Sequence, residues 1–292
     1  MKLLFLSTSF LFLTSCSNVS LLGDIESNDQ DVLFNESLMR YSDRRLEAVE
    51  IKSSLGGVKE CHIGDISKGL TKLKEQYNIL KEDPEYWNHI GNCYFLDKNF
   101  EKAAFFYQIS METAKVKKIK YPAVYNNLGV LSTKKRQFSQ AFAYFNKALD
   151  INSSLLTPKF NLSQIYIKFG QLDKAKRHLD GLLKRSRNDV DVLASLGIVH
   201  LFKKQPKKSV EYFEKIGKEY ISREDIAAYF AMALYEFGDV NKALKVLKEQ
   251  DNPKLDEVKQ ISKNLKTKIL KEIERLEKIK KEQEANKKKK KA

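Results

Sequence analysis

Apolar and small residues recur along the middle of the chain with a period of 34 residues. An apolar residue followed by a small one occurs at Leu128-Gly129 and then three more times at intervals of 34, and Ile90-Gly91 precedes the series by 38 residues. The apolar residues around each pair lie three or four apart, which predicts amphipathic helices. Repetition at this period indicates a solenoid in which each unit is a pair of antiparallel helices.

A second small residue follows the first by twelve positions in every unit, and a large apolar residue follows four positions later. The pairs are Ala103 and Tyr107, Ala141 and Phe145, Ala175 and Leu179, Ser209 and Phe213, and Ala243 and Leu247. We expect the small residues to lie where the two helices of a unit cross, because they allow close approach of the backbones. The large residues should fill the space around each crossing.

These residues resemble the tetratricopeptide repeat. The unit beginning at Pro84 matches its pattern best, with Trp87, Ile90-Gly91, Tyr94, Ala103 and Tyr107. The resemblance implies an all-α, right-handed solenoid of helical hairpins, with units starting near Pro84, Pro122, Leu156, Val190 and Glu224. A weaker unit should precede them, since residues 65–80 have helical apolar spacing. The four extra residues before Tyr121 should lengthen the second helix of the first unit.

One long helix is expected after Asn252-Pro253. Its apolar residues are Val258, Ile261, Leu265, Ile269, Ile273, Leu276 and Ile279, which lie three or four apart. A solenoid needs a terminal cap, and this helix has the apolar face to cover the last repeat. It is longer than a cap requires, so its far end either projects or pairs with a partner as a coiled coil.

The first sixteen residues are typical of an export signal. Lys2 precedes a short apolar run, Leu3 to Leu13, which suits a signal peptide better than a membrane span. The following Leu13-Thr14-Ser15-Cys16 is similar to the bacterial lipobox, which implies cleavage after residue 15 and lipid on Cys16. The alternative is an ordinary signal peptide or an uncleaved anchor. Ser17, in place of an aspartate, favours the periplasmic face of the outer membrane.

The expected organisation has six segments. They are a lipoprotein signal peptide at 1–15, lipidated Cys16 with a flexible tether at 16–42, a degenerate repeat-like unit at 43–83, five repeats at 84–257, a capping helix at 258–286 and a polybasic tail at 287–292. Composition agrees with an all-α class. Only 12 Gly and 5 Pro argue against a turn-rich sandwich or barrel, and 42% hydrophobic residues exclude global disorder.

The sequence contains no nucleotide-binding, hydrolase or metalloprotease motif, so we expect no catalytic residue, no cofactor and no metal. The four histidines, His62, His89, His178 and His200, lie in different units without ligand spacing. Cys61 and Cys93 remain once Cys16 is lipidated, and export places them in an oxidising compartment. They fall near the ends of first helices in neighbouring units, so they form either a disulfide or two buried free thiols.

The resemblance implies that first-helix residues line a concave groove, which here has two unlike halves. The early half supplies Asn88, His89, Asn92, Asn126, Asn127, Asn161 and Gln164. The later half supplies Ile198, Leu201, Phe202, Tyr229, Met232 and Tyr235. We expect the amides to pair with the backbone of an extended peptide and the apolar half to receive its side chains. Alternatively, these residues contact an adjacent helix. The lysine that the family uses to clamp chaperone carboxylates is absent.

Charge is concentrated at the end of the chain. The net charge is +15, and residues 259–292 hold 14 Lys+Arg against 5 Asp+Glu, which is +9. Lys287–Lys291 form an uninterrupted run that is either a solvated tail or a contact to an anionic surface. An exported protein seldom meets nucleic acid, so none is expected as a partner.

The expected function is that of a lipid-anchored scaffold that binds protein or peptide partners during cell-envelope assembly. Lipobox and tandem repeats together resemble the pilotin-type lipoproteins of pili and secretion machines, which implies a role in their biogenesis. The alternative is an adaptor for peptidoglycan-remodelling enzymes.

Overall fold

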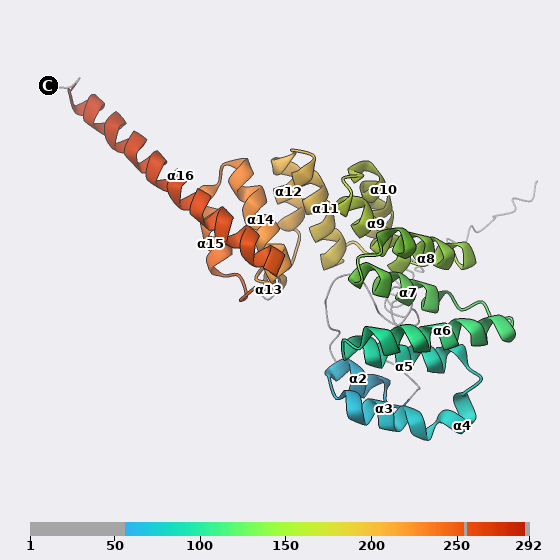
Figure 1. Ribbon diagram of the computed structural model, residues 1–292. Helices are drawn as coiled ribbons and strands as arrows, with labels where there is room; N and C mark the ends of the chain where they lie inside the picture. Colours follow the sequence, from blue (N-terminus) through green and yellow to red (C-terminus); the bar gives the residue numbers. More distant parts are fainter. Residues whose placement is uncertain (1–55, 254–255, 290–292) are drawn as a thin grey trace, which may run out of the picture.

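The computed structural model describes residues 56–253 and 256–289, which form fifteen helices and no strand (Figure 1). The helices are α2 (Val58–Ile63), α3 (Ile66–Glu75), α4 (Tyr77–Leu80), α5 (Pro84–Leu96), α6 (Phe100–Val116), α7 (Pro122–Lys134), α8 (Phe138–Ile151), α9 (Thr157–Lys168), α10 (Leu172–Leu183), α11 (Val190–Phe202), α12 (Pro206–Phe213), α13 (Lys218–Ile221), α14 (Glu224–Phe237), α15 (Val240–Lys248) and α16 (Asp256–Lys289). The expected all-α, right-handed solenoid of helical hairpins is confirmed.

Five hairpins follow one another along the solenoid: α5/α6, α7/α8, α9/α10, α11/α12 and α14/α15. The turn inside each hairpin has one residue with positive φ, and these residues keep the repeat spacing: Lys98, Arg136, Gly170, Lys204 and Gly238. The residue after each of them donates its backbone N–H to a carbonyl five residues earlier, as Asn99 does to Tyr94. The turns therefore satisfy helix-end carbonyls through one shared geometry, even where lysine or arginine replaces glycine.

The crossings inside the hairpins are as close as the small residues suggested. A Cβ added at Gly129 would lie 2.5 Å from the Phe145 ring, and one added at Gly197 would lie 2.7 Å from the Phe213 ring. Phe145 and Phe213 are fully buried. Each glycine thus makes room for the aromatic ring of its partner helix, as expected.

The first helices form the inner layer of the curve. Successive first helices, from α5 through α7, α9 and α11 to α14, contact one another, whereas within the described residues successive second helices make no comparable contacts. The layer with the closer spacing lies inside the bend, so the first helices face the concave side. Helix α6 has 17 residues and α8 has 14, which confirms that the extra residues before Tyr121 lengthen α6.

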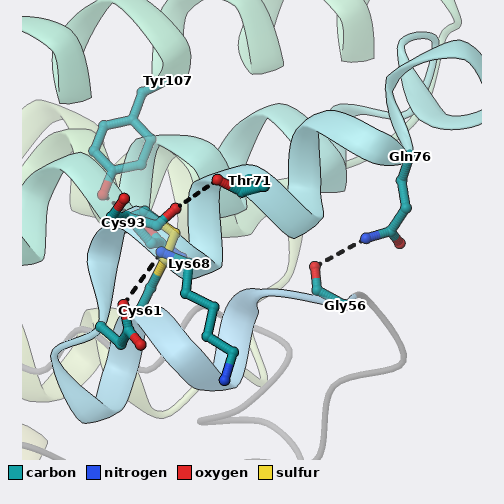
Figure 2. The surroundings of a disulfide bond; sticks show 10 residues. Gly56, Cys61, Lys68, Thr71, Gln76, Cys93 and Tyr107 are labelled. Carbon is teal, nitrogen blue, oxygen red and sulfur yellow. Dashed lines mark hydrogen bonds between the residues drawn. A yellow bond between two sulfur atoms is a disulfide. The ribbon is translucent and has the colours of Figure 1, made fainter.

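The N-terminal part of the described chain is a smaller helical unit, α2 to α4. The helical spacing over residues 65–80 is divided in two, because α3 ends at Glu75 and α4 begins at Tyr77. The Gln76 side chain donates to the Gly56 carbonyl oxygen at 2.9 Å, as Figure 2 shows. Cys61 of α2 and Cys93 of α5 form a disulfide with 5.2 Å between their Cα atoms (Figure 2). This bond joins the small unit to the first hairpin.

Helix α16 caps the solenoid and then leaves it. Its first half packs against α14 and α15, where Leu265 and Ile269 are buried. Further along, Leu276 is 42% exposed, and the helix runs away from the repeats (Figure 1). None of the described helices combines the length and apolar character that a membrane crossing requires.

Several expected features lie outside the described residues. They are the signal peptide, Cys16 and its tether, the start of the unit at 43–83, and the last residues of the basic run, which the structure describes to Lys289.

Candidate functional site

The five asparagines expected in the groove are buried between the first helices. Asn88 and Asn92 lie on α5, Asn126 and Asn127 on α7, and Asn161 on α9, each with 1% of its surface exposed or less. Their amides therefore do not face a groove where a peptide backbone could pair with them. This location differs from the expectation, and the reason is that neighbouring first helices pack closely enough to enclose these positions.

The buried amides bond to one another across repeats, and we refer to these five asparagines as the amide ladder. Asn127 Nδ2 donates to Asn88 Oδ1 at 2.8 Å and to Asn92 Oδ1 at 3.0 Å, which joins α7 to α5. Asn161 Nδ2 donates to Asn126 Oδ1 at 2.9 Å, which joins α9 to α7. Because an amide carries both donors and an acceptor, it can bond to the repeat before and the repeat after it.

Three further residues predicted to line the groove instead make contacts inside the solenoid. Gln164 is half-buried, and its Nε2 donates to the Ser195 hydroxyl at 2.9 Å, which links α9 to α11. His89 is buried, and its Nε2 lies 3.3 Å from Glu85 Oε1 on the same helix. Leu201 is 4% exposed and belongs to the core around α11 and α14. All three therefore make contacts within the solenoid.

The remaining predicted residues form an apolar surface on the concave side. We call them the apolar face; they are Ile198, Phe202, Tyr229, Met232 and Tyr235. Phe202 is 43% exposed, and its ring meets the Tyr229 ring edge-on with 6.1 Å between centroids. The other members are partly buried, with their inner parts packed on the core between α11 and α14. The structure thus brings this half of the predicted groove together on two neighbouring first helices.

A partly buried charge cluster fixes the spacing of α11 and α14. Arg223 Nη2 donates to Asp191 Oδ1 at 2.8 Å and to Asp225 Oδ2 at 2.7 Å. Asp191 is 4% exposed at the start of α11, and the two carboxylates raise the pKa of Arg223 further above its ordinary value although burial opposes this. A charge-assisted cluster of this kind holds the two helix starts in register. The apolar face therefore rests on a fixed pair of helices.

Helix α16 forms a wall beside the apolar face. Ile273 packs on the same core cluster as Tyr235 and Met232. Arg275 lies close enough to Tyr235 for an electrostatic interaction, and Glu272, three residues earlier on the helix, raises the pKa of Arg275 through a hydrogen bond. Sequence reasoning placed Ile273 on the capping stripe but did not connect it to the face. The apolar spacing could identify the packed side of α16, although not the first helix that it meets.

His62 and His89 lie near each other in the structure, although 27 residues separate them in the sequence. His62 is buried on α2, where burial and the nearby His89 lower its pKa to about 4. His200 stacks on Tyr212 at 5.2 Å between centroids and bonds through Nδ1 to Gln205. Across residues 56–253 and 256–289, no cluster of His, Cys, Asp and Glu side chains is arranged to hold a metal ion.

Comparison with known proteins supports the repeat assignment. Residues 133–197 match the family model of the tetratricopeptide repeat. The RNA polymerase-associated protein CTR9 of Caenorhabditis elegans is 26% identical over 179 residues, and this match covers 58% of the chain but 16% of that relative. The chain therefore spans about a sixth of the length of this relative.

Two bacterial proteins share the architecture of this chain. PilW, a type IV pilus biogenesis factor, is 17% identical with a TM-score of 0.57, over 70% of this chain and 94% of PilW. PilF of Pseudomonas aeruginosa is 12% identical with a TM-score of 0.56, over 76% of this chain and 90% of PilF. Likeness at this identity concerns the fold. The chain is thus similar to bacterial tetratricopeptide repeat proteins in its fold, and its central hairpins match the repeat itself.

Proposed function

We propose that this protein is a scaffold that binds a segment of a partner protein on the apolar face. Proteins built from tetratricopeptide repeats are generally non-catalytic scaffolds for protein interactions. The observation that carries the proposal is the pairing of Phe202 and Tyr229, whose rings meet across two first helices while Phe202 remains 43% exposed. Aromatic and methionine side chains grouped on a concave surface are typical of sites where a few residues supply most of the binding energy.

The ligand is recognised through its apolar side chains. The amide ladder is enclosed within the solenoid, so it supports the scaffold and does not read a peptide backbone. The Arg223 cluster keeps α11 and α14 in register, so the apolar face needs little rearrangement to accept a ligand. A short segment with two or three large apolar residues would cover Phe202, Tyr229 and Met232.

The proposed place of action is the periplasmic face of the bacterial outer membrane, with the protein held there by lipid on Cys16. Two features support this location. The sequence before Cys16 is similar to a lipobox, and the disulfide between Cys61 and Cys93 suits an oxidising compartment. The basic run Lys287–Lys291 at the end of the projecting α16 would contact anionic groups on the envelope surface.

The proposed process is envelope assembly, in particular the biogenesis of a pilus or secretion machine. The combination of lipobox and repeats supports this role, and PilW, described as a type IV pilus biogenesis factor, has the same architecture. The proposal predicts that loss of the protein impairs assembly of such a machine. An adaptor for peptidoglycan-remodelling enzymes would instead be captured together with those enzymes.

The binding site is tested by substitution on the apolar face. Tyr229→Ala/Met232→Ala/Tyr235→Ala, and separately Phe202→Ala, should abolish capture of the partner from envelope extracts. The matched control is Phe105→Ala/Val116→Ala, which removes two exposed apolar side chains from α6 on the opposite layer and should leave capture unchanged. Phe202→Ala keeps the test valid if the triple variant unfolds, because this ring is the most exposed of the set. Capture that survives both variants would contradict the site.

The anchor is tested separately. Cys16→Ser should release the protein from the membrane fraction and abolish labelling with a fatty-acid analogue, while binding at the apolar face persists. Unchanged labelling and sedimentation would contradict lipidation at this residue. This result would leave the proposal of binding at the apolar face unaffected.

A further inference from the structure

A hollow lies away from the apolar face, where the start of α9 meets the second half of α10. Its volume is about 430 Å³. Its lining consists of Ser154, Leu156, Lys159, Arg177, His178, Gly181, Leu182 and Arg185. No residue of the apolar face or the amide ladder takes part in it.

The hollow concentrates positive charge. Lys159, Arg177 and Arg185 line it, and no carboxylate is present among the described residues of the lining. None of the three cations forms an ion pair with a carboxylate in the described part of the chain, whereas Lys176, beside Arg177, is paired with Asp180 at 2.6 Å. Arg177 does interact electrostatically with Asp173, whose pKa it lowers, so Lys159 and Arg185 are the less compensated charges. Three cations around one concavity repel one another, and an anion placed between them would relieve that repulsion.

Two of the three cations, Lys159 and Arg177, lie close to His178. Its ring lies against Tyr166 with 5.5 Å between centroids, which holds it in place at the wall of the hollow. Burial lowers the pKa of His178, and Lys159 and Arg177 lower it further. Both cations are therefore close to the same point of the hollow from two different helices.

The floor of the hollow is apolar and open. Leu156 and Leu182 are buried beneath it. A Cβ added at Gly181 would meet no atom within 4 Å, so this helical glycine leaves space where other residues would place a side chain. The hollow thus combines a cationic rim with an apolar recess.

We propose that this hollow binds a phosphomonoester that carries an organic group. The planar forks of Arg177 and Arg185 match phosphate oxygens, and Lys159 adds a third charge. The volume of 430 Å³ lies within the range of about 300–1,000 Å³ typical of small-molecule sites, which leaves room beside the phosphate for the attached group. The source is either a soluble phosphorylated compound or a lipid headgroup, which share this chemistry. The inference does not depend on the proposed function.

The test begins with calorimetric titration of the full chain with glycerol 3-phosphate and with inorganic phosphate. We expect glycerol 3-phosphate to bind more tightly, because it also occupies the recess. Arg177→Gln and Arg185→Gln should each weaken its binding by about tenfold or more, as the loss of a charged hydrogen bond does. The matched control is Arg187→Gln, which removes an exposed arginine of the same loop outside the lining and should leave the affinity unchanged.

A second variant adds a side chain to the lining of the hollow without altering charge. Gly181→Val should abolish binding of glycerol 3-phosphate while the melting temperature is maintained, since the added side chain enters open space. Flotation with vesicles of phosphatidylcholine, with and without phosphatidate, separates the two sources. Binding to phosphatidate vesicles that Gly181→Val abolishes identifies a lipid headgroup, and binding of glycerol 3-phosphate alone identifies a soluble ligand.

Three results would overturn the proposal. One is the absence of binding both to glycerol 3-phosphate and to phosphatidate vesicles. Another is an equal loss of affinity in Arg187→Gln and Arg185→Gln, which would indicate attraction to the general positive charge. The third is binding of inorganic phosphate as tight as that of glycerol 3-phosphate, or binding unaffected by Gly181→Val.

Discussion

Asn127 donates from Nδ2 to Asn88 Oδ1 at 2.8 Å, although 39 residues separate the two in the chain. The same Nδ2 is 3.0 Å from Asn92 Oδ1, and the Tyr107 hydroxyl donates to that oxygen at 2.8 Å. Side chains of two repeats therefore complete one buried hydrogen-bond network. Such a network couples neighbouring repeats, because breaking one member leaves polar groups of the other without partners in the interior.

The first prediction concerns this network. Asn127→Ala should lower the free energy of unfolding by about 3 kcal/mol, because it removes two donor contacts and leaves Asn88 and Asn92 with fewer partners in the interior. Urea denaturation followed by circular dichroism measures the change. Asn188→Ala, at an exposed position between α10 and α11, is the control and should change stability by less than about 0.5 kcal/mol. Equal stability of the two variants would contradict the role of the ladder.

The second prediction concerns the crossing of α7 and α8. Gly129→Ala should destabilise the protein strongly, because the new Cβ would lie 2.5 Å from the Phe145 ring. Phe145→Leu in the same chain should restore part of the loss, since the third hairpin already pairs Ser163 with Leu179. Gly181→Ala is the control: its Cβ meets nothing, and it should stabilise α10 by up to about 1 kcal/mol. Thermal unfolding of the four proteins checks the expected order.

The third prediction concerns pH. His62 has its pKa lowered to about 4 in the folded protein, against 6.5 when exposed. A lowered pKa means that the folded protein favours the neutral ring. Above about pH 6.5 the ring is neutral in both the folded and the unfolded chain, so the free energy of unfolding has its full value there. It declines as the pH falls from 6.5 to 4, by about 3 kcal/mol in all. His62→Gln should show a smaller decline over this range, measured by denaturant unfolding at each pH. An equal decline in both proteins would show that a group other than His62 causes the loss of stability.

The fourth prediction concerns the disulfide. Cys61 and Cys93 are 32 residues apart, and closing a loop of this length stabilises a fold by about 3 to 4 kcal/mol. Reduction, or Cys61→Ser/Cys93→Ser, should therefore increase amide hydrogen exchange in α2 and α3. Exchange in α14 should stay the same, because repeats communicate mainly with their neighbours. An equal increase in α14 would show that the bond stabilises the whole solenoid and not one end of it.

The fold could be predicted from the spacing of residues in the sequence, because each small residue and its large partner lie at fixed positions in every repeat. Gly129 and Phe145 could be paired from the sequence for this reason. The candidate site was only half predictable. Asn88 and Tyr229 both occupy first-helix positions expected to line the groove, yet the first is fully buried and the second partly exposed. That difference depends on how closely successive first helices pack, and the position within a repeat does not determine it.

The packing of the long helix α16 was also predictable only in part. Its apolar stripe predicted a cap, and the burial of Leu265 and Ile269 agrees with it. The proximity of Arg275 to Tyr235 was not predictable, because it depends on the angle at which α16 crosses α14. Long-range placement of this kind follows from packing between elements, on which local periodicity carries no information.

The central claim is that a partner protein occupies the apolar face, and site-specific photo-crosslinking tests it most directly. A photoreactive phenylalanine analogue would replace Phe202 or, in a control, Phe169, which is also exposed but lies in the turn between α9 and α10. We predict one covalent adduct from Phe202 in intact cells, lost in Tyr229→Ala/Met232→Ala, and none from Phe169. Adducts from Phe169 alone, or an adduct from Phe202 that persists in the double variant, would contradict the account.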